Sequence, residues 1–301
     1  MRVFLTGATG FIGSRIVPEL IAAGHRVLGL TRSDAGARML AAAGAETHRG
    51  TLEDLDSLRA GAKRADAVIH TAFDHDFSHF VANCEKDRRA IAALGGALDG
   101  SDRPLLITSG TGIGNAGPGT PAREDVFNPS HPNPRIASEE AGNLLLEAGL
   151  DIRVVRLPQV HDTVRQGLTS PYIELSRQLG MAAYVGDGAN RWPAAHVLDV
   201  AKLYALVLDR GHRGARYHAV AEQGIAMRMI AEAVATGLGV PAVSLSAKEA
   251  QAKLGWLAAF AGFDMPASSE WTRAELGWAP GGPGLIADLE AKDYAPPPAT
   301  A

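Results

Sequence analysis

Three glycines near the start of the chain are spaced as in loops that bind phosphate. They stand in Val3-Phe4-Leu5-Thr6-Gly7-Ala8-Thr9-Gly10-Phe11-Ile12-Gly13, between a short apolar run and a helical stretch. One glycine permits a tight turn, one lets backbone N–H groups approach a pyrophosphate, and one lets helix and strand pack closely. The N-terminus of the following helix favours the anion. The segment therefore predicts a dinucleotide site rather than a purely structural turn, with contacts from Gly7, Thr9, Gly10, Phe11 and Ile12.

The loop after the second apolar run indicates which dinucleotide to expect. It reads Thr31-Arg32-Ser33, whereas a site selective for NAD carries a carboxylate there for the ribose hydroxyls, and Asp34 comes later in the loop. Arg32 can pair with a 2′-phosphate and Ser33 can hydrogen-bond it, so we expect NADP(H) in preference to NAD(H). The alternative is that Arg32 is a solvated surface residue. Leu52, after the third run, is expected beside the adenine.

The elements that must position these loops follow from an alternation along the chain. Short β-branched runs alternate with Ala/Leu-rich helical stretches, which is typical of βαβ units around a parallel sheet. The expected strands are Val3 to Thr6, Arg26 to Leu30, Glu46 to His48, Ala67 to His70, Leu105 to Thr108 and Ile152 to Arg156.

The fold class that this pattern predicts is α/β, with a Rossmann-type doubly wound parallel sheet and a smaller C-terminal substrate lobe. The cofactor domain is expected over residues 1–156, with a return strand near 216–221. The lobe is expected over 157–294 and is non-contiguous, with a helix near Tyr172 to Leu179. The proline-rich tail, residues 295–301, is expected to be disordered.

Several motifs together resemble the extended, epimerase/dehydratase-like branch of the short-chain dehydrogenase/reductase superfamily, over nearly the whole chain. Besides the glycine loop, the matching segments are Ile107-Thr108-Ser109-Gly110-Thr111, Val155-Arg156-Leu157-Pro158, Val185-Gly186-Asp187-Gly188, His196-Val197-Leu198-Asp199 and Leu276-Gly277-Trp278-Ala279-Pro280. The resemblance implies that Thr71, Ala72 and Pro158 run along the cofactor. It further implies that Ser109 lies beside the cofactor and polarises a substrate carbonyl, with Thr111 contacting the substrate.

The resemblance breaks at the proton relay, where the superfamily has a tyrosine four residues before a lysine. In Asn133-Pro134-Arg135-Ile136-Ala137-Ser138-Glu139 those positions hold Arg135 and Glu139, so the chain is identified as an atypical member. A carboxylate cannot lower a tyrosine pKa as lysine does, but it can accept hydrogen bonds from ribose hydroxyls. Arginine is a poor acid but a good clamp for developing negative charge. We therefore count Arg135 and Glu139 as catalytic candidates, the alternative being that both face solvent on a helix beginning near Ile136.

Three further side chains fall near or inside the expected lobe. His161 follows a strand end and is a candidate substitute acid, although a loop histidine is often incidental. Tyr172 and Tyr184 are candidate substrate contacts, with structural tyrosines as the alternative. The lobe aromatics Trp256, Phe260, Phe263 and Trp271 are expected to form its core rather than to line a pocket.

One histidine- and aspartate-rich segment invites a metal interpretation, which we do not adopt. The run from Phe73 to His79 matches no ligand spacing, and a pocket edge or a helix N-terminus capped by Asp76 is the better interpretation. No metal is therefore expected.

Composition excludes several classes of protein. The net charge of −4 comes from interspersed signs, so neither nucleic acid nor a membrane surface is an expected partner. No apolar run approaches the roughly 20 residues of a membrane span, and the start of the chain does not resemble a signal peptide. Cys84 is the only cysteine, which excludes an internal disulfide and fits a cytoplasmic location. A homodimer is left open.

Two functions are consistent with these residues. The first is an NADPH-dependent reductase of a small organic substrate, with Ser109 orienting the acceptor beside Arg135. The acceptor is a carbonyl, conjugated alkene, quinone or imine, since the last three need less from the missing tyrosine acid. The second is a non-catalytic protein that senses NADP(H). Epimerisation or dehydration of a sugar nucleotide is disfavoured because it depends on the missing tyrosine.

Overall fold

A seven-stranded parallel sheet forms the centre of the structure, a computed structural model that describes residues 1–117 and 119–295. The strand order is β3-β2-β1-β4-β5-β6-β10. The strands are β1 (Arg2–Thr6), β2 (Arg26–Thr31), β3 (Glu46–Arg49), β4 (Ala67–His70), β5 (Leu105–Gly110), β6 (Ile152–Leu157) and β10 (Arg216–His218). The six strands expected before residue 157 are present to within two residues at their ends. The return strand is Arg216–His218, shorter than the expected 216–221, because the chain then leaves this sheet for another.

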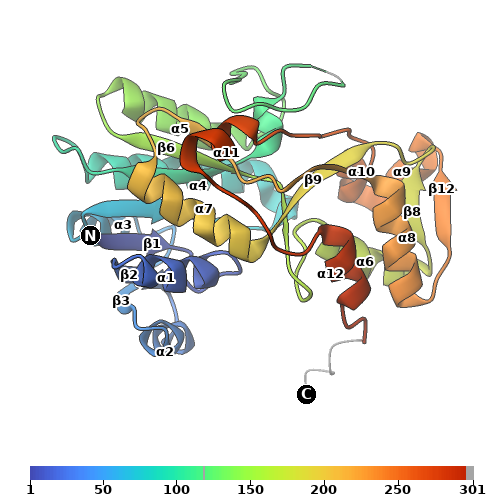
Figure 1. The fold of residues 1–301 in the computed structure, drawn as a ribbon, viewed down its shortest axis with the longest axis horizontal. Coiled ribbons are helices and arrows are strands. Elements are labelled where there is room, and N and C mark those ends of the chain that lie inside the picture. Colours follow the sequence, from blue (N-terminus) through green and yellow to red (C-terminus); the bar gives the residue numbers. More distant parts are fainter. Residues whose placement is uncertain (118, 296–301) are drawn as a thin grey trace.

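Helices cover both faces of the sheet, so the fold is the α/β class expected from the sequence (Figure 1). Successive strand residues point to opposite faces. Val3 and Leu5 of β1 pack against α1 (Gly13–Ala22) and α7 (Val197–Arg210), which contact each other. Phe4 packs on the other face, which is covered by α3 (Leu55–Lys63), α4 (Phe80–Gly96) and α5 (Ile136–Glu147), while α2 (Asp34–Ala42) lies beside β2 and β3.

Most of the chain after β6 forms a smaller lobe with its own hydrophobic core, on the right in Figure 1. Its strands are β7 (Gln159–His161), β9 (Arg191–His196) and β11 (Glu222–Ala226) in one sheet, and β8 (Ala182–Val185) and β12 (Ala242–Leu245) in a second. Its helices are α6 (Thr169–Leu179), α8 (Met227–Leu238), α9 (Ala247–Leu254), α10 (Ala258–Ala261) and α12 (Leu285–Ala291). Short 3₁₀ turns are η1 (Phe77–His79), η2 (Thr111–Gly114) and η3 (Gly255–Leu257).

The chain crosses between the two cores more than once. It returns to the first core in α7 and β10, and again in α11 (Glu270–Leu276), which contacts both. Trp278 is buried in the first core, whereas Leu285 and Leu289 of α12 are buried in the second. Between them, the Asp199 carboxylate accepts hydrogen bonds from the backbone N–H groups of Gly281 and Gly282, at 3.1 and 2.7 Å. The exact boundary between a cofactor domain and a substrate lobe stays a prediction.

The aromatic residues expected in the core of the lobe lie largely at its surface. Trp256 is 42% exposed, Phe263 61% and Trp271 42%. Trp256 lies on the short 3₁₀ turn η3, Phe263 follows α10 in a loop, and Trp271 stacks on Tyr217 at 5.3 Å. The prediction of a core role is therefore wrong for these three residues, while Phe260 is half-buried against the core.

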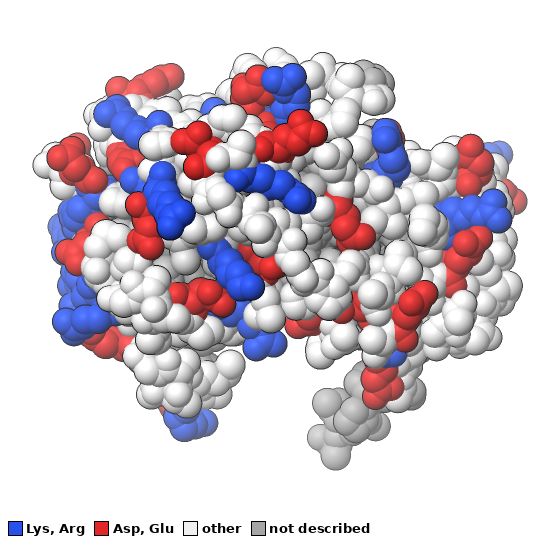
Figure 2. Space-filling view, in the orientation of Figure 1, with Lys and Arg blue, Asp and Glu red and all other residues white. Residues whose placement is uncertain are grey.

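Further expectations concern membrane-spanning helices, the distribution of surface charge and the C-terminal tail. Within the described residues, no helix has the length and apolarity needed to span a membrane. Lys/Arg and Asp/Glu are interspersed over the face seen in Figure 2. The expected disordered tail lies outside the described residues, apart from Ala295.

Candidate cofactor site and active site

The glycine loop joins β1 to α1, and its glycines have distinct roles. Gly7 has φ +69°, in the left-handed region, and a Cβ there would come 2.8 Å from the Ala72 nitrogen and from Thr71 Oγ1. A Cβ on Gly13 would overlap the Gly7 carbonyl, so helix and loop could not approach as they do. Gly10 N–H donates to that carbonyl at 2.8 Å. The sequence predicted the turn and the close packing correctly.

The N-terminus of α1 is free to bind an anion. Its N-cap residue, Ile12, provides no side-chain cap, and the first turn has no acidic residue. Among the described residues, none accepts a hydrogen bond from the backbone N–H of Phe11 or Ile12. These donors and the helix dipole suit a pyrophosphate, and the half-buried side chains of Thr9, Phe11 and Ile12 line the approach.

The loop after β2 presents one arginine without a carboxylate partner in the described part of the chain. Arg32 is exposed, whereas Asp34, the nearest acid, pairs with Arg49. The Ser33 hydroxyl accepts a hydrogen bond from Gly36 N–H at 3.1 Å and so caps α2, which leaves its own proton to donate. Leu52 packs half-buried against the core below this loop. The arrangement fits the adenosine end of a nicotinamide dinucleotide.

Residues at the end of β4 connect the glycine loop to α4. Thr71 Oγ1 donates to the Thr6 carbonyl at 2.8 Å, and Ala72 N–H donates to Thr6 Oγ1 at 3.3 Å. The buried His70 ring lies 2.7 Å from the same Thr6 hydroxyl and 3.0 Å from Asp87 of α4. Thr71 and Ala72 therefore lie against the glycine loop, and their expected place along the cofactor stays a prediction.

Arg135 lies at the start of α5 and is held by the same network. Its Nη1 donates to Asp87 Oδ2 and to Ser138 Oγ, both at 2.6 Å, and its Nη2 donates to the Thr108 carbonyl at 3.0 Å. The guanidinium carbon stands 4.0 Å above the Phe73 ring. Burial raises the pKa of Asp87, but the charge of Arg135 and the hydrogen bond from His70 outweigh it, so this pKa is lowered. Arg135 is 14% exposed and does not face bulk solvent.

Glu139, one turn further along α5, is part of a buried ion-pair cluster. Its carboxylate accepts two hydrogen bonds from Arg156 of β6, at 2.7 and 2.8 Å, and one from Arg216 of β10 at 2.9 Å. Both Glu139 and Arg156 have no exposed surface. Contrary to one expectation, Glu139 does not face solvent, and its oxygens accept hydrogen bonds from the buried Arg156 and the half-buried Arg216, while a contact with the cofactor ribose stays a prediction.

The residues expected to orient a substrate after β5 are buried. Ser109 is 3% and Thr111 4% exposed, and the Ser109 hydroxyl has no hydrogen-bond partner in the described part of the chain. Ser109 is the register partner of Arg156, so both side chains leave the sheet on the face that holds Glu139. A role for Ser109 and Thr111 in binding substrate stays a prediction, as does the position of the half-buried Pro158 beside the nicotinamide.

His161 is not an exposed acid. It lies in β7 with no exposed surface, and its Nδ1 is 2.6 Å from Asp288 of α12. Burial lowers its pKa despite the neighbouring carboxylate. In this structure the histidine therefore joins the sheet of the lobe to α12, and the proton-donor role expected from its place after the strand is not supported.

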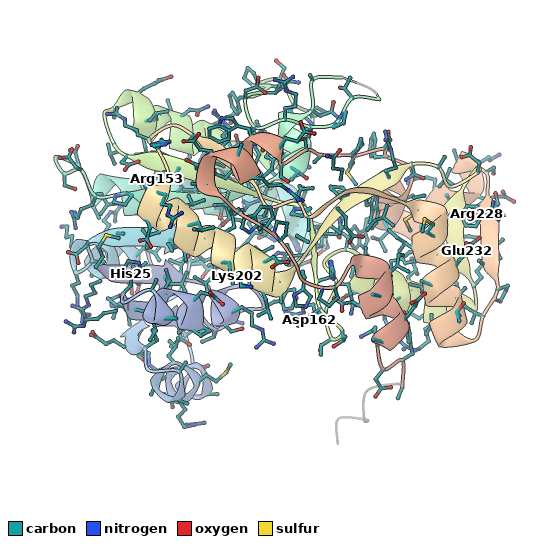
Figure 3. All side chains as sticks on the ribbon, viewed as in Figure 1. His25, Arg153, Asp162, Lys202, Arg228 and Glu232 are labelled. Atoms are coloured by element: carbon teal, nitrogen blue, oxygen red, sulfur yellow. The ribbon has the colours of Figure 1, made fainter. Side chains whose placement is uncertain are left out.

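The loop after His161 brings two charged residues, Asp162 and Arg165, close to α1 and the glycine loop. Asp162, which Figure 3 labels near the middle of the molecule, lies 3.8 Å from Arg15 of α1. The Arg165 guanidinium carbon is 5.9 Å from the centre of the Phe11 ring. Neither Arg165 nor Asp87 was singled out from the sequence, since an isolated charged residue in a loop or helix carries no local signal.

The two tyrosine candidates differ in position but neither lies at this site. Tyr172 is 1% exposed and donates to the Ala183 carbonyl at 2.9 Å, so it is a core residue and not a candidate contact for substrate. Tyr184 is half-buried on β8, with Arg228 of α8 6.0 Å from its ring. Figure 3 shows Arg228 at the end of the molecule remote from α1. The substrate contact expected of Tyr184 stays a prediction.

The run from Phe73 to His79 forms a helix N-terminus, as expected. Asp76 caps η1 by accepting from Ser78 N–H at 3.0 Å. No group of three or more His, Cys, Asp or Glu is arranged to hold a metal ion among residues 1–117 and 119–295.

Comparisons with known proteins agree with this geometry. The profile of a family described as NAD(P)H-binding matches residues 7–177. An uncharacterized protein of Schizosaccharomyces pombe is 42% identical over 98% of this chain and 100% of its own length. A decarboxylating sterol-4-alpha-carboxylate 3-dehydrogenase of Dictyostelium discoideum is 41% identical over 24% of this chain and 22% of its own length.

A solved structure shares the whole fold. The dTDP-glucose 4,6-dehydratase of Streptomyces venezuelae, solved with NAD bound, superposes with a TM-score of 0.76 at 20% identity, covering 97% of this chain and 96% of that one. The chain therefore belongs to the NAD(P)H-binding family, and its fold is that of this dehydratase.

Proposed function

We propose that this protein is an NADPH-dependent reductase of a small organic substrate. The substrate is a carbonyl compound, a conjugated alkene, a quinone or an imine. Bound NADPH supplies the hydride, and the side chains of this chain bind the cofactor, orient the acceptor and stabilise the charge that develops on it.

The observation that carries this proposal is the fixed cation at the position of the family's tyrosine. Three hydrogen bonds, to Asp87, Ser138 and the Thr108 carbonyl, hold the Arg135 guanidinium. Its Nε–H and one Nη2–H have no acceptor in the described part of the chain, and 14% of the side chain is exposed. Such preorganised donors stabilise an oxyanion without reorganising during the reaction.

Arg32 supports NADPH over NADH. The arginine is exposed beside the N-terminus of α2, and Asp34 is held by Arg49, so no free carboxylate competes for the ribose. A contact between arginine and a 2′-phosphate is charge-assisted, and NADH lacks that phosphate.

Calorimetric titration with both cofactors tests the preference. NADPH should bind more tightly than NADH, and Arg32→Ala should reduce the ratio of the NADH and NADPH dissociation constants by about tenfold or more. Lys248→Ala, which removes the same charge from an exposed position on α9, is the control and should leave the ratio unchanged. Equal affinities in the unmodified protein would contradict the preference.

A panel of carbonyl, enone, quinone and imine substrates, followed by NADPH absorbance, tests the reaction. Arg135→Ala should lower kcat by about 10²–10³-fold while changing NADPH affinity much less, because the arginine acts on the transition state. Arg89→Ala, on the exposed side of α4, is the matched control. Tight NADPH binding with no turnover of any panel member would contradict a reductase and favour the sensing role.

A further inference from the structure

Five aromatic side chains form a continuous cluster across the two halves of the molecule. Phe77 stacks on Trp256 with ring centres 4.7 Å apart and planes 10° apart. The other neighbouring rings lie 5.5 to 6.5 Å apart: Phe77 and Phe80, Trp256 and Phe260, Phe73 and Phe80, and Phe77 and Phe260. We call Phe73, Phe77, Phe80, Trp256 and Phe260 the aromatic cluster.

One end of the aromatic cluster lies at the candidate active site. Phe73 directly follows Ala72, which packs against Gly7, and its ring lies under the Arg135 guanidinium at 4.0 Å. The charges of Arg135 and Arg165 both lower the pKa of His75. The ring of His75 is 5.2 Å from that of Phe73. Arg165 also lies over the ring of Phe11. The segment that carries Phe73 and His75 therefore lies close to the loop that carries Arg165, next to the phosphate loop.

The other end of the cluster is open to solvent. Trp256 is 42% exposed, and Phe73, Phe77, Phe80 and Phe260 are each half-buried. Partly exposed aromatic side chains beside a site suit a flat apolar ligand, because stacking removes apolar area from water on both partners and adds a favourable ring–ring geometry.

The acid–base groups near this site restrict the type of acceptor. The hydroxyl of the buried Tyr204 lies 2.6 Å from Thr108 Oγ1, and burial raises the pKa of this phenol. His75 is exposed, and the charges of Arg135 and Arg165 contribute to lowering its pKa. A simple ketone needs a proton as its alkoxide forms, whereas a quinone reduced by hydride gives a phenolate that is stable until water protonates it.

We propose that the acceptor of this reductase is a planar aromatic carbonyl compound of the quinone class, stacked on the aromatic cluster with its oxygen directed to Arg135. The proposal rests on the reductase function above. The quinone takes up the hydride and then a proton from water, becoming the hydroquinone, while the C–H bond at C4 of the dihydronicotinamide breaks and NADPH becomes NADP⁺.

A binding experiment tests this without turnover. Calorimetry with 9,10-phenanthrenequinone and the protein saturated with NADP⁺ should show binding, and Trp256→Ala should weaken it about tenfold, the size of one lost stacking contact. Trp256→Phe, which keeps a ring, should restore most of the affinity. Phe263→Ala, an exposed aromatic outside the aromatic cluster, is the matched control and should bind as the unmodified protein does.

The outcomes separate this inference from the reductase function. No binding by the unmodified protein, or equal binding by the Trp256→Ala variant, overturns the aromatic acceptor even if aliphatic carbonyls are reduced. Binding that depends on Trp256, followed by NADPH oxidation, supports both. Binding without any NADPH oxidation overturns the reductase and with it the acceptor role. Thiol addition does not complicate the titration, because Cys84 is buried and burial raises its pKa to about 11.

Discussion

Two charged residues replace the usual tyrosine and lysine, and their surroundings give them different roles. Arg135 pairs with Asp87 of α4 and has 14% of its side chain exposed, whereas Glu139 has no exposed surface and pairs with Arg156 and Arg216. A buried carboxylate is tolerated only when hydrogen-bonded cations compensate its lost hydration. We therefore expect Glu139 to contribute to the stability of the fold, and we propose that Arg135 acts on a ligand.

Replacing Glu139 should reduce stability rather than cofactor affinity. In Glu139→Ala the fully buried Arg156 loses its carboxylate partner, which we expect to cost about 3–5 kcal/mol in the free energy of unfolding. Urea unfolding at pH 7 measures this change, and calorimetry on the folded fraction should find NADPH affinity within about threefold of the unmodified protein. Unchanged stability together with weak NADPH binding would instead restore the ribose-anchoring role.

The same pair predicts the direction of a pH effect. Burial raises the pKa of Glu139, but the hydrogen bonds and charges of Arg156 and the charge of Arg216 lower it further, to below its ordinary 4.5. The ion pair therefore stabilises the fold fully above pH 4.5, and this contribution is lost as the pH falls through the lower, folded-state pKa. The difference in the free energy of unfolding between the unmodified protein and Glu139→Gln should become smaller as the pH falls below 4.5. His218 also contacts Arg156, and burial lowers its pKa to about 3, but it titrates in both proteins.

At the scale of elements, the junction of β1 and α1 combines packing with an anion site. Gly7 and Gly13 are required for the turn and for the approach of the helix, while the uncapped N–H groups of Phe11 and Ile12 remain for a ligand. Gly10 lies between them, exposed, with only the Gly7 carbonyl within 4 Å of an added Cβ. A larger side chain can therefore be placed at Gly10 to test whether a ligand approaches there, with little change to the hydrophobic core.

Gly10→Val should abolish cofactor binding in a protein that still folds. A branched side chain there would occupy the space in which backbone and pyrophosphate meet. Gly96→Ala, at the end of α4 where an added Cβ meets no atom within 4 Å, is the control and should bind the cofactor normally. Circular dichroism checks folding and calorimetry measures binding. A folded Gly10→Val variant with full affinity would show that the phosphates bind elsewhere.

At the scale of the whole molecule, the C-terminal segment connects the two hydrophobic cores. Trp278 is buried in the first, its indole N–H donates to the Asp199 carbonyl at 3.0 Å, and α12 is packed in the second. The Asp199 carboxylate binds the intervening Gly281 and Gly282. The relative placement of cofactor loop and aromatic cluster depends on such crossings, because the lobe shares no strand with the large sheet.

Removing the Asp199 carboxylate should destabilise the connection that the C-terminal segment makes between the two hydrophobic cores. We expect Asp199→Ala to lower the free energy of unfolding by about 1–3 kcal/mol, since a charged acceptor of two N–H groups is lost. Lys202→Ala removes only a partner 3.9 Å away whose side chain is 56% exposed, and it should change stability by less than about 0.5 kcal/mol. Calorimetric unfolding compares the two variants, and equal stabilities would contradict the role given to Asp199.

The sequence by itself determined the features that depend on neighbouring residues. The six strands, the glycine loop and the alternation that produces a parallel sheet were all predictable, because hydrophobic period, turn chemistry and helix N-termini involve residues close in the chain. The resemblance to the extended reductases also rested on short, contiguous motifs.

Only the tertiary structure decided which charges are buried in ion pairs and which remain partly exposed. Arg135 meets Asp87 across 48 positions, and Glu139 meets Arg216 across 77, so neither pairing leaves a local pattern. The same holds for the buried Tyr172 and His161 and for the exposed Trp256, which amphipathic spacing could not place. Burial and ion pairing are set by which surfaces meet when the elements pack, and a polar side chain in the sequence is compatible with either outcome.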